Sequence, residues 1–299
     1  MAKSSKQYKV RCSSLPARSH PVAIKIEAEL NKLKSWEISS SSSSAKAEKL
    51  LSAVSGLEEL YKCIGDLFNL PLTQEALSQY RHENWVNELL DIMLKYLDIC
   101  SNTRDVVLMI KESVRELQSA LRRSKIGELS IESNVDAYIC SRKKMKKEIS
   151  KCLASLKQMD QEVIESSPIS ELNDNLLLVI RLLKKTSLIS NIIFSSLLSF
   201  LSAGMKKPRA TRWSAVWKLV KKKVATFEDQ GEANELENAD NVISNLLNKE
   251  DEAAEMKIES AREKLEALDL SIEGFENGLD CLFRRLIHAR VSLMNILSQ

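Results

Sequence analysis

The chain has 299 residues, 44% of them hydrophobic and 28% charged, and a net charge of +3. This length and composition fit an ordinary folded protein with a sizeable core, and so small a net charge does not demand nucleic acid as a partner. Only seven glycines and five prolines occur. Because sheets need many tight turns, and turns draw on these two residues, their scarcity predicts an all-α chain.

The scarcity of glycine also bears on function. Phosphate-binding loops, dinucleotide-binding folds and nucleophile elbows need glycines at fixed offsets, and this chain has very few. The six cysteines form no C-x-x-C pair and the three histidines lie far apart, so we expect no metal site and no cofactor. No local Ser/His/Asp or Cys/His arrangement indicates catalysis. The sequence therefore predicts a protein that is not an enzyme.

The beginning of the chain is basic. Residues 1–19 contain no acid, and we expect a disordered basic tail, with an organelle transit peptide as the alternative. Pro21 stands where a helix can begin. Ser39–Ser44 is a run of six serines that predicts a flexible linker, because serine buries no apolar surface. Residues 20–298 are expected to form a single all-helical domain around this linker.

Apolar residues recur at helical spacing along the rest of the chain. Pro71 ends one such stretch, Gly127 separates two, and Pro168 restarts the chain at a first helical position. We expect helices over about 45–69, 73–123 (a short helix and then a long one), 129–163 and 168–203, with two or three more over 211–298.

The segment 187–203 raises the question of a membrane. Lysine pairs at 184–185 and 206–207 bracket about 20 residues, which is the length that spans a bilayer. Seven of the residues in this segment are serine or asparagine, however, as in a central helix of a bundle. We favour a buried bundle helix and leave a membrane-inserted segment open.

Residues 206–223 carry eight lysines and arginines and no acid. Two tryptophans one turn apart give the segment 206–227 the pattern of a basic amphipathic helix, which can lie on an anionic membrane or bind a protein partner. The alternative, which we favour, is a bundle helix with buried tryptophans and a solvated basic face. The candidate interaction residues in this segment are Trp213, Trp217, Lys218, Lys221 and Lys222.

Two further segments are strongly charged. Residues 228–255 hold ten acids and one base, and such a block is usually mobile or solvated. Folding of this block against the basic segment, which it would mask, is the alternative. A basic cluster at Arg142–Lys147 resembles a nuclear-import patch. Apolar residues at helical spacing flank it, and we therefore expect a solvated helix face.

The last helix has the most regular pattern. Its apolar residues alternate three and four apart from Leu265 to Ile296, which is typical of a coiled coil or an antiparallel bundle. Whether this seam closes within one chain is left open. Gly274 and Gly278 beside it either let a neighbouring helix approach closely or merely weaken the helix. The candidate interaction residues along the seam are Leu279, Leu282 and Leu286.

Several segments carry a family resemblance when they are taken together and in this order. They are Ser14-Leu-Pro-Ala-Arg-Ser-His-Pro21, the serine run, Leu70-Pro-Leu-Thr-Gln-Glu-Ala-Leu77, Trp85-Val-Asn-Glu-Leu-Leu-Asp91, Ser141-Arg-Lys-Lys-Met-Lys-Lys147, and the end from Gly274-Phe-Glu-Asn-Gly-Leu-Asp-Cys-Leu-Phe-Arg-Arg-Leu-Ile287 through Arg290-Val-Ser-Leu-Met-Asn-Ile-Leu297. Over about residues 13–298 the chain resembles the plant-specific BYPASS-related proteins. The resemblance implies a plant protein without known enzymatic activity, linked to root and shoot development and to control of a mobile root-derived signal. It supplies no catalytic residues.

We therefore expect one elongated antiparallel helical bundle of long helices. Its expected function is that of a non-enzymatic regulatory or scaffold protein in root and shoot development, acting through helix–helix protein contacts. The alternative is a peripheral membrane protein that uses the basic segment 206–227. The expected partners are unidentified proteins, with an anionic membrane surface and self-association as open alternatives and no specific nucleic acid. The expected location is the cytoplasm or a membrane surface inside the cell, with plastid and nucleus left open.

Overall fold

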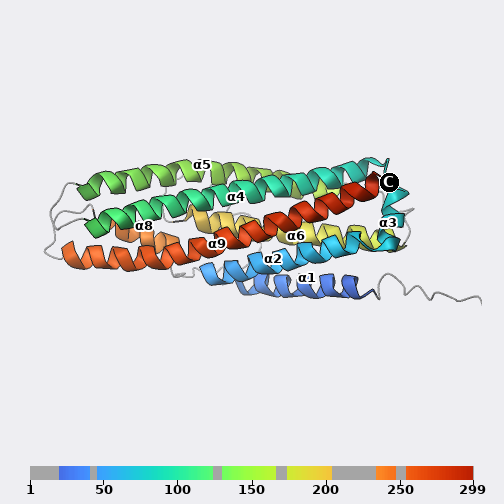
Figure 1. The fold of residues 1–299 in the computed structure, drawn as a ribbon, viewed down its shortest axis with the longest axis horizontal. Helices are drawn as coiled ribbons and strands as arrows, with labels where there is room; N and C mark the ends of the chain where they lie inside the picture. The colour runs from blue at the N-terminus through green and yellow to red at the C-terminus, as the bar shows by residue number, and fades with distance from the viewer. Residues whose placement is uncertain are drawn as a thin grey trace, which may run out of the picture.

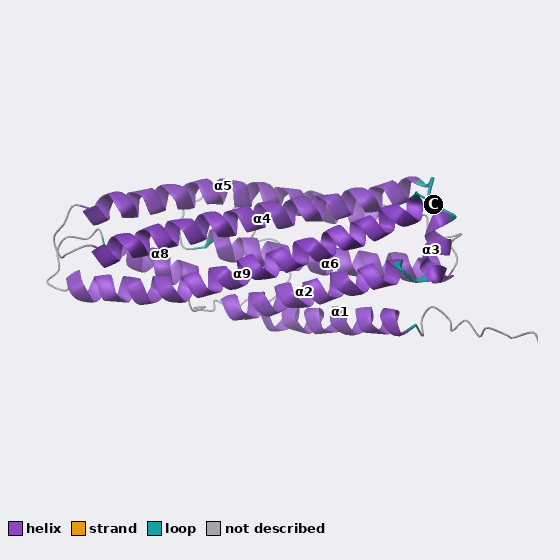
Figure 2. Ribbon diagram, viewed as in Figure 1, coloured by secondary structure: helices purple, strands orange, loops and turns teal. Residues whose placement is uncertain are grey.

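The computed structural model describes residues 20–40, 46–123, 130–165, 174–203, 234–246 and 254–298. Within these ranges the chain forms α-helices and no strand (Figure 2), which confirms the all-α class. The helices are α1 (Pro21–Ser40), α2 (Ala47–Phe68), α3 (Pro71–Ser78), α4 (Asn84–Arg123), α5 (Ser130–Glu165), α6 (Asp174–Ser202), α8 (Glu235–Asn245) and α9 (Ala254–Leu297).

The long helices lie side by side along one axis, and the bundle is elongated (Figure 1). The two longest are α4, with 40 residues, and α9, with 44 residues. At about 1.5 Å per residue they are roughly 60 and 66 Å long. The expected elongated bundle of long helices is therefore present.

Helix α9 lies at the centre of the bundle and contacts α2, α3, α4 and α8. Helix α4 runs antiparallel to it, as the ion pairs Arg104–Asp280 and Arg115–Asp269 show. Helix α2 runs parallel to α9, because Leu51 lies against Gly274 and Val54 lies against Gly278. The bundle is thus antiparallel along most of its contacts, and α2 with α9 is a parallel pair.

The predicted seam of α9 runs through the hydrophobic core. Every seam residue from Leu265 to Leu293 is fully buried, and Ile296 is only 2% exposed. The contacts that bury it come from the other helices of the same chain. The seam therefore closes within one chain in this structure.

The two glycines beside the seam mark the close approach of α2 to α9. A β-carbon at Gly274 would lie 2.9 Å from a methyl group of Leu51, and one at Gly278 would lie 3.1 Å from a methyl group of Val54. Both separations are shorter than an ordinary contact between carbon atoms. Of the two explanations considered for these glycines, close packing is the one that the structure supports.

Two predicted boundaries are refined. Helix α1 continues through Ser40, and the hydroxyl of Ser39 donates to the carbonyl of Trp36 at 2.8 Å, so the first two serines of the predicted linker are helical. Pro71 follows the end of α2 and is also the first residue of α3. Several predictions lie outside the described residues: the tail 1–19, the linker residues 41–44, the break at Gly127, the restart at Ser167–Pro168, and the basic segment 206–227.

Candidate functional site

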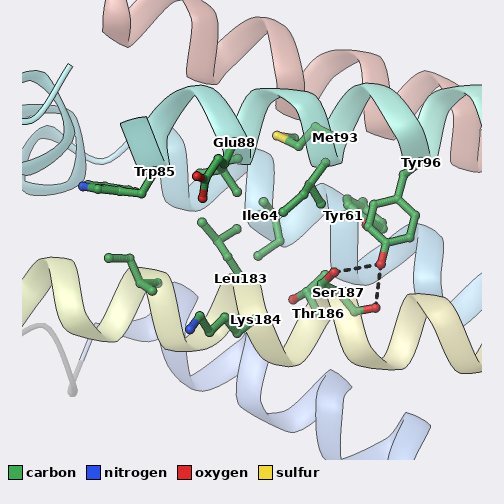
Figure 3. Close-up of a pocket in the computed structure, with 13 residues that line it drawn as sticks. Tyr61, Ile64, Trp85, Glu88, Met93, Tyr96, Leu183, Lys184, Thr186 and Ser187 are labelled. Carbon is green, nitrogen blue, oxygen red and sulfur yellow. Dashed lines mark hydrogen bonds between the residues drawn. The ribbon is translucent and has the colours of Figure 1, made fainter. Parts of the chain in front are cut away.

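A pocket opens between α2, α4 and α6, with a cavity volume of about 80 Å³ (Figure 3). Its walls are mostly apolar and include Leu89 and Ile92 of α4 and Leu183 of α6. Figure 3 places Trp85 at one end of the pocket and a group of hydroxyl-bearing side chains at the other. The polar members of the lining are Tyr61, Glu88, Tyr96, Lys184, Thr186 and Ser187.

The inner end of the pocket is built around Tyr96, which is 1% exposed. Its phenol oxygen lies 2.7 Å from the carbonyl oxygen of Ser187, 2.8 Å from the hydroxyl of the same serine, and 2.8 Å from the side-chain oxygen of Asn191. A phenol has one proton to donate, and it goes to one of the carbonyl-type acceptors. The hydroxyl of Ser187 therefore donates to the phenol oxygen of Tyr96.

A second chain of hydrogen bonds begins at Tyr61. Its hydroxyl lies 3.1 Å from the hydroxyl of Ser190, which in turn donates to the carbonyl of Thr186 at 2.7 Å. Because the proton of Ser190 goes to that carbonyl, Tyr61 is the donor in the first bond. The hydroxyl of Thr186 donates to the carbonyl of Leu182 at 2.9 Å. These polar groups are buried, and each one has a partner within the bundle.

Burial keeps the phenol of Tyr61, at the inner end of the pocket, in its neutral form. Loss of solvent raises the pKa of Tyr61 well above its usual value of 10.0. Burial also raises the pKa of the nearby Cys100 thiol to about 12. The inner end of the pocket therefore carries no negative charge at neutral pH from these two groups.

The outer end of the pocket is open to solvent and carries both signs of charge. Glu88 is exposed, and Trp85 and Lys184 are half-buried. Neither Glu88 nor Lys184 forms an ion pair with another residue in the described part of the chain. The pocket therefore has three parts. Its mouth is charged, and its buried inner end is lined with hydroxyl oxygens. The apolar middle section between them, which we call the waist, is lined by Leu89, Ile92 and Leu183.

A second buried polar group lies where α5, α6 and α8 meet. Arg142 and Asp240 form an ion pair with 3.0 Å between Nη2 and Oδ2, and Tyr138 donates to the same carboxylate at 2.6 Å. The guanidinium also donates to the carbonyls of Leu201 and Ala203 at the end of α6. A cation at this position satisfies the last carbonyls of the helix and interacts favourably with its dipole.

This junction corrects the expectation for the basic cluster at 142–147. Lys143, Lys144 and Lys147 are exposed, as expected for a solvated helix face, but Arg142 is only 2% exposed. Its position on the helix turns it inward beside Met145, toward the carboxylate of another helix. Arg142 is therefore a structural ion-pair partner and does not belong to a surface patch.

The acidic block 228–255 is also corrected where the structure describes it. Residues 234–246 contain helix α8, which Asn234 caps through a bond from the backbone N–H of Glu237, and which packs on α9. Two of its acids form long-range contacts. Asp240 joins the junction with Arg142, and the carboxylate of Glu235 accepts from the backbone N–H of Ala47 at the start of α2. Apolar residues at helical spacing, Leu236 and Ile243 among them, supply the buried face.

The predicted interaction residues fall into two groups. Trp213, Trp217, Lys218, Lys221 and Lys222 lie outside the described residues. Leu279, Leu282 and Leu286 are fully buried in the seam of α9. These three leucines therefore hold the core together in this structure and leave a partner to use some other surface.

The outward side of α9 offers such a surface. Ile287, Val291 and Met294 recur four and three residues apart on one face, and they are 41%, 47% and 43% exposed. We call these three residues the outer stripe of α9. Sequence reasoning missed it because the stronger seam pattern on the same helix dominates the apolar periodicity.

Neither a metal centre nor a membrane span occurs among the described residues. No group of three or more His, Cys, Asp or Glu side chains there is placed to hold a metal ion. None of the described helices combines the length and the apolar character that crossing a bilayer requires. In α6, Ser187, Ser190 and Asn191 are buried and lie in the hydroxyl network, as in the bundle helix that the sequence favoured.

The fold and the pocket define an all-α protein built as an elongated helical bundle. A comparison with family models agrees with the sequence resemblance: the model described as Protein BPS1 matches residues 53–296. The chain therefore belongs to the Protein BPS1 family, which confirms the resemblance to BYPASS-related plant proteins. Membership places it among plant proteins related to development. Comparisons with curated proteins and with solved structures found no match.

Proposed function

We propose that the chain is a non-enzymatic regulatory or scaffold protein in root and shoot development that works by binding protein partners. The observation that supports this proposal is the outer stripe of α9. The central helix of the bundle buries its seam against its own chain and still presents Ile287, Val291 and Met294 to solvent. Exposed apolar residues on one helix face at this spacing are the anchors that helix-binding grooves recognise.

The stripe suits a partner that contributes an apolar groove or a second helix. Apolar side chains grouped on one face gain free energy when a partner removes them from water, whereas scattered ones gain little. The neighbouring Arg284 and His288 are exposed and supply a polar rim. An apolar centre with a polar rim is the usual anatomy of a protein interface.

Proximity labelling in plant roots tests this proposal. The chain is compared with a variant that carries Ile287→Asp, Val291→Asp and Met294→Asp. Because the three positions are exposed, the variant should fold, which thermal unfolding checks. We expect it to lose a defined subset of the labelled proteins and to fail to restore root and shoot growth in a plant that lacks the protein.

A matched control is available on the same helix. Leu270 is 70% exposed and lies outside the outer stripe, so Leu270→Asp adds a charge without touching the stripe. This variant should keep the labelled set of the parent chain. An unchanged labelled set and full rescue with the triple variant would refute the role of the stripe. Light scattering of the purified chain shows whether the partner is a second copy.

A second candidate is peripheral attachment to an anionic membrane through the segment 206–227. The observation that favours it is the run of eight lysines and arginines without an acid over 206–223, with two tryptophans one turn apart. Flotation with anionic and neutral vesicles tests it. We expect binding to anionic vesicles that Trp213→Ala/Trp217→Ala abolishes. Intact binding by this variant would refute the attachment.

A further inference from the structure

We propose that the pocket between α2, α4 and α6 binds a small, apolar, uncharged molecule that carries a hydroxyl group. This inference goes beyond protein partners and does not depend on the outer stripe of α9. It follows from the direction in which each hydroxyl at the inner end of the pocket donates its proton.

Four hydroxyl groups line the inner end, and all four donate into the protein. Tyr61 donates to Ser190, Thr186 donates to the carbonyl of Leu182, and Ser187 donates to Tyr96. Tyr96 in turn donates to a carbonyl-type oxygen on α6. A hydroxyl oxygen whose proton is committed still has a lone pair that accepts. The inner end of the pocket therefore presents acceptors and no hydroxyl donor to whatever occupies it.

An occupant must bring the donor that these oxygens lack. A hydroxyl group on the ligand can donate to the phenol oxygen of Tyr61 or to the hydroxyl oxygen of Thr186. A carboxylate has only acceptors and would face the lone pairs of these oxygens. An ammonium group has donors, but at this depth it would give up its hydration, because Tyr61 and Thr186 are 4% and 2% exposed. An uncharged hydroxyl is the group that fits.

The waist of the pocket sets the size and character of the remainder. Leu89, Ile92 and Leu183 surround it with aliphatic groups, and Trp85 adds an aromatic ring toward the mouth. One water molecule needs about 10–15 Å³ of such a volume, so a cavity volume of about 80 Å³ holds roughly five to eight water-sized groups. A single ring with one hydroxyl and one small alkyl substituent matches this space.

The test uses three probes that share one methyl-substituted ring against the full chain. They are 4-methylphenol, its methyl ether 4-methylanisole, and 4-methylbenzoate, and binding is measured by calorimetry and by ligand-observed NMR. We expect saturable binding of the phenol, binding of the ether that is about three- to tenfold weaker because its donor is capped, and no saturable binding of the carboxylate.

Variants locate the binding site. Leu183→Trp fills the waist and should abolish binding of the phenol. Tyr61→Phe and Thr186→Val each remove one acceptor, and each should reduce the preference for the phenol over the ether, which a merely structural effect would not alter. Tyr138→Phe removes a buried phenol hydroxyl at the Arg142 junction, away from the pocket, and should leave the preference unchanged.

Several outcomes overturn the proposal. If no probe binds, the cavity is a hydrated gap in packing. If the ether or the carboxylate binds as tightly as the phenol, the inner end does not select a donor. If Tyr61→Phe and Thr186→Val both fold and keep the full preference, the hydroxyl of the ligand is bound elsewhere.

Discussion

Arg142 and Asp240 form an ion pair inside the bundle, with 3.0 Å between Nη2 and Oδ2 and side chains that are 2% and 7% exposed. The pair links α5 to α8, and the same guanidinium holds the end of α6 through the carbonyls of Leu201 and Ala203. The side chain of Arg142 on α5 thus forms hydrogen bonds to both α6 and α8. Removing either charge would leave the other one buried without its partner.

The first prediction concerns this pair. Arg142→Met and Asp240→Asn should each lower the free energy of unfolding by about 3–5 kcal/mol, because each leaves an uncompensated buried charge or removes its hydrogen bonds. Denaturant titration measures the change. Lys151 pairs with Glu148 on the surface, with side chains that are 72% and 49% exposed, so Lys151→Met is the matched control and should cost less than about 1 kcal/mol. Equal losses in all three variants would contradict the prediction.

The junction shows where sequence reasoning stops. Local charge predicts Arg142 as part of a surface patch because four lysines follow it within five residues, and its partner stands 98 residues later in a block of acids. The polar contacts at the inner end of the pocket likewise join residues that are far apart in the sequence. Helical spacing places Tyr61 on an inward face, but Ser190 lies 129 residues away and Tyr96 lies 91 residues from Ser187. Periodicity identifies the buried face of a helix, and only the packing of helices selects which buried polar groups meet.

The seam of α9 is the opposite case, because a periodic pattern alone determines its burial. Every third or fourth residue from Leu265 to Ile296 is apolar, and a helix with such a pattern must cover that side. The structure confirms it residue by residue. The pattern does not say whether the covering helices belong to the same chain. The contacts of α9 with α2, α4 and α8 show that the covering helices belong to the same chain in this structure.

The second prediction separates the seam from the outward side of the same helix. Leu279 is fully buried and Leu270 is 70% exposed. Leu279→Asp should lower the free energy of unfolding by about 4 kcal/mol or more, since it buries a carboxylate in the core, whereas Leu270→Asp should change it by less than about 0.5 kcal/mol. Circular dichroism during thermal unfolding measures both. A Leu279→Asp protein with unchanged thermal stability would show that the seam does not hold the core.

The third prediction compares two glycines in the packing of α2 against α9. Gly65 lies against His288, whose imidazole is exposed and can rotate into solvent. Gly65→Ala should therefore stabilise the protein by about 0.5–1 kcal/mol, the usual gain from alanine within a helix. Gly278 lies against Val54, which is 1% exposed and has a β-branched side chain with little rotational freedom.

Gly278→Ala should accordingly give no gain, or a loss of about 1 kcal/mol, although the intrinsic helix preference is the same. Urea titration of the two variants beside the parent chain measures the difference. Because both substitutions are glycine to alanine within long helices, the change in the unfolded state is common to both. Equal stabilisation at both positions would mean that α2 and α9 do not approach closely at Gly278.

The fourth prediction concerns alkaline pH. Burial raises the pKa of Cys100 from its usual 9.0 to about 12, and burial raises the pKa of Tyr61 and Tyr138 above their usual 10.0. Each of these groups therefore loses its proton at a lower pH in the unfolded chain than in the folded chain. The stability contributed by keeping these groups neutral is therefore complete below about pH 9 and is lost as the pH rises from there.

Each such group should add a slope of about 1.4 kcal/mol per pH unit to the loss of stability above its unfolded pKa. Denaturant titrations at increasing pH measure the slope, which Tyr61→Phe should reduce above about pH 10 and Cys100→Ala from about pH 9. Tyrosinate absorbance supplies an independent probe. Tyr61 and Tyr138 should ionise only together with unfolding, because burial of both phenol groups in the folded bundle disfavours the charged phenolate. Ionisation of all the tyrosines while the far-ultraviolet helical signal is intact would show that water reaches the inner end of the pocket.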